Sequence, residues 1–291
     1  MEIKEVGIIG SGQMGNGIAH VCALSGYKVV LIDIAEEALT NAIGTIKKNL
    51  KRQVEKEKIS QSDMDRALSN IVTNTESKAL KNADLIIEAA TENFDLKVKI
   101  FKGVLEYIKE SCLLSTNTSS MSITKLAANT DRPERFIGLH FMNPVPVMKL
   151  VEIIPGIATS DEMLETTKSF AESLGKTIAV AKDYPAFIAN RILVPMINEA
   201  IYSLYEGAGD IKSIDTAMKL GMGHPMGPLE LADFVGLDTC LAIMNVLYEG
   251  FGDTKYSPCP LLVKYVEAGW YGVKSGKGFY DYSGATPIPT K

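Results

Sequence analysis

The sequence predicts an α/β protein in which a doubly wound, mostly parallel sheet is followed by a smaller, all-helical C-terminal domain. Short apolar runs alternate with helical stretches over the first part of the chain, a glycine-rich turn joins the first strand to the first helix, and β-branched runs become rare after about residue 184. The 291 residues suffice for two domains, and 46% apolar with 22% charged residues is ordinary for a globular protein.

The first elements along the chain form a βαβ unit. Residues 6–9 (VGII) are a short apolar run typical of a buried strand, and residues 13–24 carry apolar side chains at helical spacing up to Ser25 and Gly26. Residues 28–34 (KVVLIDI) are predicted to form the next strand. Two strands joined by a helix within about 30 residues lie parallel, with a right-handed crossover.

The same alternation continues to residue 181. Helices are predicted over residues 36–58 and 95–109, and strands over residues 71–73, 83–89, 112–115, 136–141, 150–154 and 177–181. Beyond the segment KDYP at 182–185, helical patterns dominate, over residues 187–205, 213–220, 229–247 and 260–268. We therefore predict a first domain over residues 1–184, with a helical insertion near 36–69, and a helical domain over residues 185–291.

Composition excludes several classes of protein. The net charge of −5 argues against a nucleic-acid binder, and no apolar run approaches the roughly 18 residues that span a bilayer. The N-terminus lacks the basic and apolar regions of a signal peptide. The four cysteines are widely spaced, which predicts reduced, buried thiols in a cytoplasmic protein, and the three scattered histidines predict no metal site.

The turn at residues 10–15 (GSGQMG) has the spacing of a dinucleotide-binding turn. Gly10 permits the tight turn, Gly12 lets the backbone approach a pyrophosphate, and Gly15 allows the helix to pack closely on the strand. Asp33 follows about 20 residues later, where a carboxylate accepts hydrogen bonds from the adenosine ribose and repels a 2′-phosphate. The motif therefore predicts a Rossmann-type domain that binds NAD, with NADP less favoured.

Polar residues gather where predicted strands end. They occur in residues 115–120 (STNTSS) and 138–144 (GLHFMNP), and Glu152 places a charge inside an apolar strand. An unpaired buried carboxylate is costly, so Glu152 requires a charged or hydrogen-bonding partner. Asn190 adds a polar group on the first helix of the second domain.

Several of these motifs together resemble the L-3-hydroxyacyl-CoA dehydrogenase family, most closely its monofunctional bacterial branch, which has no hydratase domain. The matching segments cover essentially the whole chain. They are NTSS at 117–120, HFMNPVPVMKLVE at 140–152, PAFIANR at 185–191, DTAMKLG at 215–221, HPMGP at 224–228 and KSGKGFY at 274–280.

The resemblance implies reversible hydride transfer between NAD(H) and carbon 3 of a short-chain 3-hydroxyacyl-CoA, such as the pair 3-hydroxybutyryl-CoA and acetoacetyl-CoA. Removing the hydroxyl proton needs a base, and histidine suits this because its pKa lies near neutral pH. His140 would be that base, and Glu152 would hold the other ring nitrogen. Ser119 and Asn190 would hydrogen-bond the reacting oxygen or the thioester carbonyl.

The resemblance also implies where the cofactor and the CoA moiety bind. Further NAD contacts are implied at Gln13, Met14, Ala90, Glu92, Lys97, Asn117, Ser119, Asn143 and Lys274. Lys48, Arg52 and Lys56 are spaced four residues apart and share a helix face, of which Arg52 and Lys56 match the family's basic CoA-contacting positions. Glu55 stands where some relatives carry a further lysine.

Two other interpretations remain open from the sequence. A gulonate-type sugar-acid dehydrogenase would share the fold and the Ser-His-Glu set, whereas the basic helix face favours CoA. A non-catalytic, crystallin-like relative would not need the complete set of Ser119, His140, Glu152 and Asn190. His20 and His224 are predicted to be structural. Abundant apolar residues in the second domain, and the resemblance, predict a homodimer through that domain.

Overall fold

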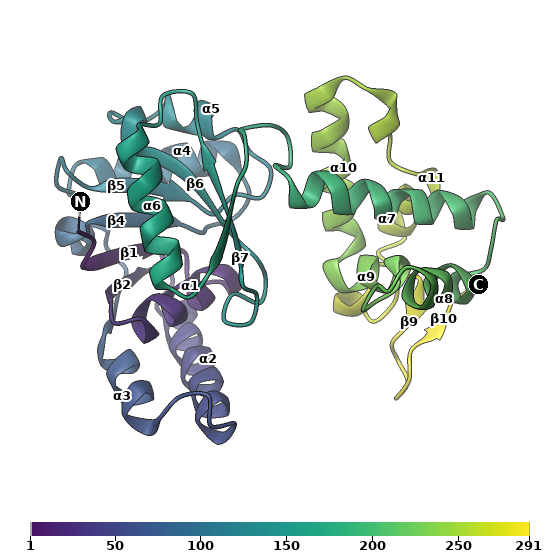
Figure 1. The fold of residues 1–291 in the computed structure, drawn as a ribbon, viewed down its shortest axis with the longest axis horizontal. Helices are drawn as coiled ribbons and strands as arrows, with labels where there is room; N and C mark the ends of the chain where they lie inside the picture. The colour runs from purple at the N-terminus through teal and green to yellow at the C-terminus, as the bar shows by residue number, and fades with distance from the viewer. Residues whose placement is uncertain (1, 291) are drawn as a thin grey trace. The chain divides into compact units, whose positions relative to one another are not determined.

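The computed structural model describes residues 2–290, which divide into two compact units, one ending at Tyr184 and the other beginning at Pro185 (Figure 1). The first unit is built on an eight-stranded sheet with the order β3-β2-β1-β4-β5-β6-β7-β8. The strands are β1 (Glu5–Ile9), β2 (Lys28–Ile32), β3 (Ile71–Asn74), β4 (Leu85–Glu88), β5 (Leu113–Thr116), β6 (Phe136–Phe141), β7 (Leu150–Pro155) and β8 (Thr177–Val180).

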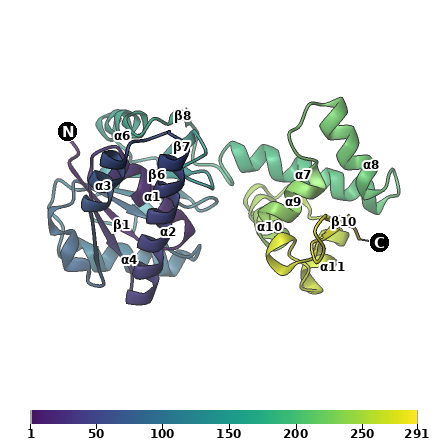
Figure 2. The same cartoon turned by 90° about the horizontal axis from the view of Figure 1, so that it is seen from below.

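Neighbouring strands of this sheet pair in parallel, apart from the antiparallel pair β6 and β7. Helices lie on both faces, with α6 and α4 on opposite sides (Figures 1 and 2). The helices of the unit are α1 (Gln13–Leu24), α2 (Glu36–Glu55), α3 (Gln61–Ser69), α4 (Phe94–Leu105), α5 (Ile123–Ala127) and α6 (Asp161–Ser173), with 3₁₀ turns at Ser77–Asn82 and Pro133–Arg135. The predicted doubly wound, mostly parallel sheet is confirmed.

Alternation along the strands decides which residues meet the core on each face. On β6, Ile137, Leu139 and Phe141 join the apolar cluster formed with α1 and α6. Because successive side chains of a strand point to opposite faces, His140 lies on the other face. That face is covered by α4 and α5, and Phe101 of α4 packs edge-on against Phe136.

The second unit is helical with a small hairpin. Its helices are α7 (Ala189–Tyr205), α8 (Ile211–Thr216), α9 (Pro228–Val235), α10 (Leu237–Phe251) and α11 (Pro260–Glu267), with a π turn at Ala217–Gly221, 3₁₀ turns at Thr254–Tyr256 and Val273–Ser275, and the strands β9 (Tyr280–Asp281) and β10 (Ile288–Pro289). Buried side chains from α7, α9, α10 and α11 form one apolar core. All four cysteines of the chain are buried and unpaired, as predicted.

Two predicted helices are interrupted in the structure. The helix expected over residues 229–247 is broken into α9 and α10 at Gly236, whose φ of +102° is incompatible with a helix. The helix expected over residues 36–58 ends at Glu55, and Glu57 adopts a positive φ of 54°. A separate helix, α3, then starts behind a capping box made by Ser60 and Asp63.

The helices α5 and α6 and the hairpin strands β9 and β10 were not predicted, and the hairpin corrects the expectation of an all-helical second domain. Most of the remaining differences are small shifts of element ends. The strand expected over residues 28–34 stops at Ile32, so Asp33 lies just beyond the sheet edge. Among residues 2–290, no single helix is both long and apolar enough to cross a membrane, and the pair α9 and α10, bent by 96°, meets that length and composition only when taken together.

Candidate active site

The glycine turn after β1 leaves an open, amide-lined end on α1. Gly10 has a φ of +97°, and a Cβ there would lie 2.7 Å from the carbonyl oxygen of Ala89. A Cβ on Gly15 would lie 1.8 Å from the Gly10 carbonyl oxygen, so only glycine allows this close packing. Gly12 is the N-cap of α1, and a Cβ added there would meet no atom within 4 Å, which leaves space for a phosphate beside the helix N-terminus.

A cavity of about 560 Å³ lies beside this turn. It is lined by Gly12 and Gln13 of the turn, by one face of α2 and by the loop at Asn143. Met14, by contrast, packs its side chain against the apolar core of the sheet, so it contributes backbone and packing at the turn. The three glycines and the helix end fit a bound dinucleotide.

Asp33 is fixed beside the same turn. Its Oδ2 accepts hydrogen bonds from both the amide and the hydroxyl of Ser11, each at 2.8 Å. Burial opposes ionisation of Asp33, but the hydrogen bonds from Ser11 and from the amides of Ala35 and Ile34 outweigh it and lower its pKa. The carboxylate is therefore ionised and oriented at neutral pH, as hydrogen bonding to a ribose and exclusion of a 2′-phosphate require.

The structure brings His140 and Glu152 together. They are directly paired across the antiparallel strands β6 and β7, and His140 Nδ1 lies 2.8 Å from Glu152 Oε2. Both side chains are almost completely buried. A carboxylate that accepts from Nδ1–H fixes the tautomer in which Nε2 is the basic nitrogen, and it stabilises the imidazolium formed when Nε2 takes a proton.

The loop after β5 is tied to the strand that carries His140. Asn117 Oδ1 accepts from the amide of Phe141 at 2.9 Å, next to His140. The Asn117 amide donates to the carbonyl of Glu88, and the Ser119 amide donates to Glu92 at 3.0 Å. Ser119 and His140 therefore stand on adjoining segments at the same edge of the sheet.

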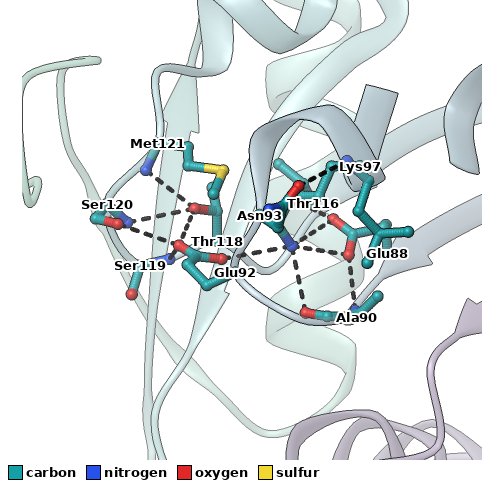
Figure 3. Close-up of polar contacts among 11 residues, drawn as sticks. Glu88, Ala90, Glu92, Asn93, Lys97, Thr116, Thr118, Ser119, Ser120 and Met121 are labelled. Carbon is teal, nitrogen blue, oxygen red and sulfur yellow. Dashed lines mark hydrogen bonds and ion pairs between the residues drawn. The ribbon is translucent and has the colours of Figure 1, made fainter. Parts of the chain in front are cut away.

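Glu92 and Lys97 belong to a polar cluster behind that loop (Figure 3). Lys97 is buried and donates to both carboxylate oxygens of Glu88, each at 2.8 Å. The Ala90 amide also donates to Glu88. Sequence reasoning missed Glu88, although a charge within the apolar strand DLIIEAA was the same signal that singled out Glu152.

The predicted CoA-contacting residues line a strongly basic cavity of about 630 Å³ in the first unit. Arg52 and Lys56, at the end of α2, contribute to its wall. Lys48 is not among its lining residues. Three further cations line it: Lys58, Lys149 and Lys176. Sequence spacing could not find Lys149 and Lys176, because they precede strands more than 90 residues away along the chain.

Family models match almost the entire chain. Residues 5–184 match the NAD binding domain of 3-hydroxyacyl-CoA dehydrogenase, and residues 187–282 match its C-terminal domain. The chain belongs to the 3-hydroxyacyl-CoA dehydrogenase family. This confirms the family inferred from the motifs, its NAD cofactor and its class as an NAD-dependent oxidoreductase.

Relatives within the family are similar over their full length. The 3-hydroxybutyryl-CoA dehydrogenase of Bradyrhizobium diazoefficiens is 60% identical over 99% of both chains. The mitochondrial hydroxyacyl-coenzyme A dehydrogenase of Homo sapiens is 42% identical over 96% of this chain and 91% of its own. The crystal structure of (S)-3-hydroxybutyryl-CoA dehydrogenase from Ralstonia eutropha is 50% identical, with a TM-score of 0.95 over 97% of this chain and 100% of that chain.

Two predicted site residues lie in the second unit, which matches the family's C-terminal domain. Asn190 is half-buried in the first turn of α7. Lys274 lies in the 3₁₀ turn at Val273–Ser275, where its Nζ is 2.5 Å from Asp238 Oδ1 and the side chain is exposed. The predicted structural role of His20 is consistent with its burial and its hydrogen bond to Gln53 at 2.9 Å.

Proposed function

We propose that the protein is an (S)-3-hydroxybutyryl-CoA dehydrogenase that acts reversibly on short-chain 3-hydroxyacyl-CoA substrates in fatty-acid or butanoate metabolism. The His140–Glu152 pair carries this proposal, because it presents an oriented acid/base beside the Ser119 loop, in the same sheet as the strand that leads into the dinucleotide turn. Relatives named 3-hydroxybutyryl-CoA dehydrogenase, at 60% identity in Bradyrhizobium diazoefficiens and 46% in Clostridioides difficile, support the same substrate class.

In the proposed reaction, His140 moves one proton. It takes the proton of the 3-hydroxyl group during oxidation and returns it to the ketone oxygen during reduction, while Glu152 stabilises the charged ring. Ser119 and Asn190 hold the reacting oxygen or the thioester carbonyl. NAD, when bound to the turn at Gly10, Gly12 and Gly15, supplies the hydride acceptor in the oxidative direction.

The test is the initial rate of acetoacetyl-CoA reduction with NADH, measured beside NADPH with the same ketone and beside gulonate with NAD. We expect turnover of acetoacetyl-CoA with NADH, weaker use of NADPH because of Asp33, and no oxidation of gulonate. Gulonate oxidation without acetoacetyl-CoA reduction would assign the chain to a sugar-acid substrate, and NADH binding without any turnover would indicate a non-catalytic relative.

We further propose that the basic cavity holds phosphate groups of the CoA moiety. Arg52 and Lys56 meet three more cations there, and phosphate oxygens are the acceptors that such a group of cations favours. In Arg52→Ala/Lys56→Ala, the KM for acetoacetyl-CoA should rise several-fold with kcat unchanged. The matched control is Lys47→Ala/Lys51→Ala, which removes two exposed cations of the same helix that do not line the cavity. Equal KM values in the two double variants would contradict the assignment.

We also propose that the functional domains are residues 1–184 and 185–291, and that the protein is a cytoplasmic homodimer joined through the second of these. Large apolar side chains exposed on the second unit support the dimer. They include Leu220 (82% exposed), Met222 (67%), Ile192 (66%) and Phe234 (56%).

A further inference from the structure

A buried ion pair closes the carboxyl end of β4, and the proposed mechanism does not use it. Glu88 is completely buried and Lys97 is 1% exposed. Lys97 Nζ lies 2.8 Å from each carboxylate oxygen of Glu88. Glu88 also accepts from the Thr116 hydroxyl at 2.6 Å and from the Ala90 amide at 2.7 Å. Because Thr116 is the register partner of Glu88 on β5, the pair is anchored in two central strands of the sheet.

Lys97 has a third charged neighbour, and this one leads to the site. Its Nζ lies 3.4 Å from Glu92 Oε2, in the loop between β4 and α4 (Figure 3). The other oxygen of Glu92, Oε1, accepts from the Ser119 amide at 3.0 Å and from the Ser120 hydroxyl at 3.2 Å. The Thr118 hydroxyl donates to the same oxygen. One carboxylate thus faces the buried lysine with one oxygen and holds three successive residues of the loop with the other.

The direction of these contacts indicates what the buried pair does. Lys97 donates to both carboxylate oxygens of Glu88 and to the carbonyl of Ala90 at 3.5 Å, and its charge also attracts Glu92 in the ion pair. The lysine can therefore influence the reaction through the charge of Glu92. The Ser119 amide is likewise engaged by Glu92, which leaves the Ser119 hydroxyl as the group available for the role proposed above.

We propose that Glu88 and Lys97 are positioning residues that act through Glu92 to hold the Ser119 loop, residues 117–121, in its reactive geometry. The proposal rests on the proposed function, in which Ser119 contacts the substrate. A reacting group displaced by about 1 Å costs on the order of 10²-fold in rate, so loss of this support should lower kcat. Binding of the substrate's CoA moiety in the basic cavity does not depend on the loop, so KM should change little.

Two variants separate positioning from stability. Glu92→Gln keeps an amide oxygen for the Ser119 loop but removes the charge that attracts Lys97; its side chain is 38% exposed, so the fold should tolerate the change. Glu88→Gln/Lys97→Met removes both buried charges together, because removal of one alone would leave the other buried without a partner. For each we expect kcat, measured at saturating NADH, to fall roughly tenfold or more, with the KM for acetoacetyl-CoA within about threefold of that of the unmodified protein.

The matched control lies at the opposite end of the same strand. Asp84, just before β4, pairs with Lys109 at 2.6 Å and accepts from the amides of Lys4 and Glu5. Asp84→Asn/Lys109→Met should lower the melting temperature but leave kcat within about twofold. Melting temperatures by circular dichroism confirm that each variant is folded at the assay temperature.

The outcomes are distinct. A normal kcat in Glu92→Gln overturns the proposal, and so does a folded Glu88→Gln/Lys97→Met variant with a lowered melting temperature and normal kcat, since the pair would then only stabilise the fold. If that double variant does not fold, Glu92→Gln decides alone. Failure of the unmodified protein to reduce acetoacetyl-CoA would instead contradict the proposed function.

Discussion

The two units of the chain each bury two carboxylates, but they surround them with different partners. In the first unit, Glu88 faces Lys97 and Glu152 faces His140, in both cases at 2.8 Å. Both carboxylates lie near or at the sheet edge where the glycine turn opens. In each case the partner is a group that carries or can gain a proton.

The second unit holds Asp215 and Asp233 with neutral donors. Asp215 accepts from two amides at the start of α9 and from the Tyr280 hydroxyl. Asp233 accepts from the amides of Phe279 and Tyr280 and from the Tyr282 hydroxyl. None of the ion pairs among residues 2–290 includes either aspartate. Asp215 and Asp233 thus attach the C-terminal segment to α9 through neutral donors, whereas Glu88 and Glu152 face side chains that carry or can gain a positive charge.

The largest expected effect is the loss of catalysis in His140→Gln, which tests the role of a buried carboxylate of the first unit. Glutamine can still donate to Glu152, so the buried carboxylate keeps a partner, but it has no basic nitrogen. We expect kcat to fall by roughly 10³-fold, within the range that a lost general base produces, while the affinity for NADH measured by fluorescence is retained. A His140→Gln enzyme with a normal rate would remove His140 from the mechanism.

The second effect is on stability, in Asp233→Ala. The change leaves the buried amide of Phe279 and the partly buried amide of Tyr280 without an acceptor. Each such group costs about 1–3 kcal/mol, so the free energy of unfolding should fall by about 3 kcal/mol. Urea unfolding followed by the fluorescence of Trp270, the only tryptophan of the chain, reports on this unit. Asp281→Ala changes a half-buried aspartate of the same hairpin, whose Oδ1 accepts only from the exposed amide of Ser283 among the side-chain hydrogen bonds of residues 2–290, and it should cost less than about 1 kcal/mol. Equal losses in the two variants would contradict an anchoring role.

The sequence predicted the residues of the proposed active site better than it predicted the contacts that hold the second unit together. The glycine turn and Asp33 can be predicted from local sequence, because Gly10 and Gly15 are required by close contacts within the turn and with the adjacent strand. His140 and Glu152 are only 12 residues apart on adjacent strands, so motif and register bring them together. The apolar pattern over residues 229–247 could not show that Gly236 breaks the expected helix, because the positive φ of Gly236 is set by the chain around it.

The sequence could not predict which residues contact each other when they lie far apart along the chain. Lys97 is a basic residue at a helix start, which a pattern cannot distinguish from a solvated or ligand-binding lysine; its burial against Glu88 depends on how α4 packs on the sheet. Lys149 and Lys176 line one cavity with Arg52, and they precede β7 and β8, which run opposite to β6, so both lysines lie at the edge of the sheet where β6 ends. Asp233 and its acceptor role depend on a hairpin more than 40 residues downstream.

The smallest effect in this comparison is on the pH dependence of stability, and the two units should respond to acid in opposite directions. In the first unit, burial and the nearby Lys176 lower the pKa of His20 to about 4. In the second, burial raises the pKa of Asp233 to about 6, although hydrogen bonds from Phe279, Tyr280 and Tyr282 oppose the shift. One group thus resists protonation in the folded state and the other favours it.

The direction of each effect follows from which state binds more protons. Between pH 6.5 and 4 the unfolded chain protonates His20 and the folded chain does not, so acidification from pH 7 to 5 lowers stability by about 2 kcal/mol through this group. Between pH 6 and 3.8 the folded chain protonates Asp233 and the unfolded chain does not, so the same change raises stability by about 1 kcal/mol. We therefore expect His20→Gln to reduce the loss of stability on acidification and Asp233→Asn to enlarge it. Urea unfolding of both variants and the unmodified protein at pH 7 and pH 5 measures how much the free energy of unfolding changes between the two pH values. If both variants alter this change in the same direction, the two buried groups do not titrate as their surroundings indicate.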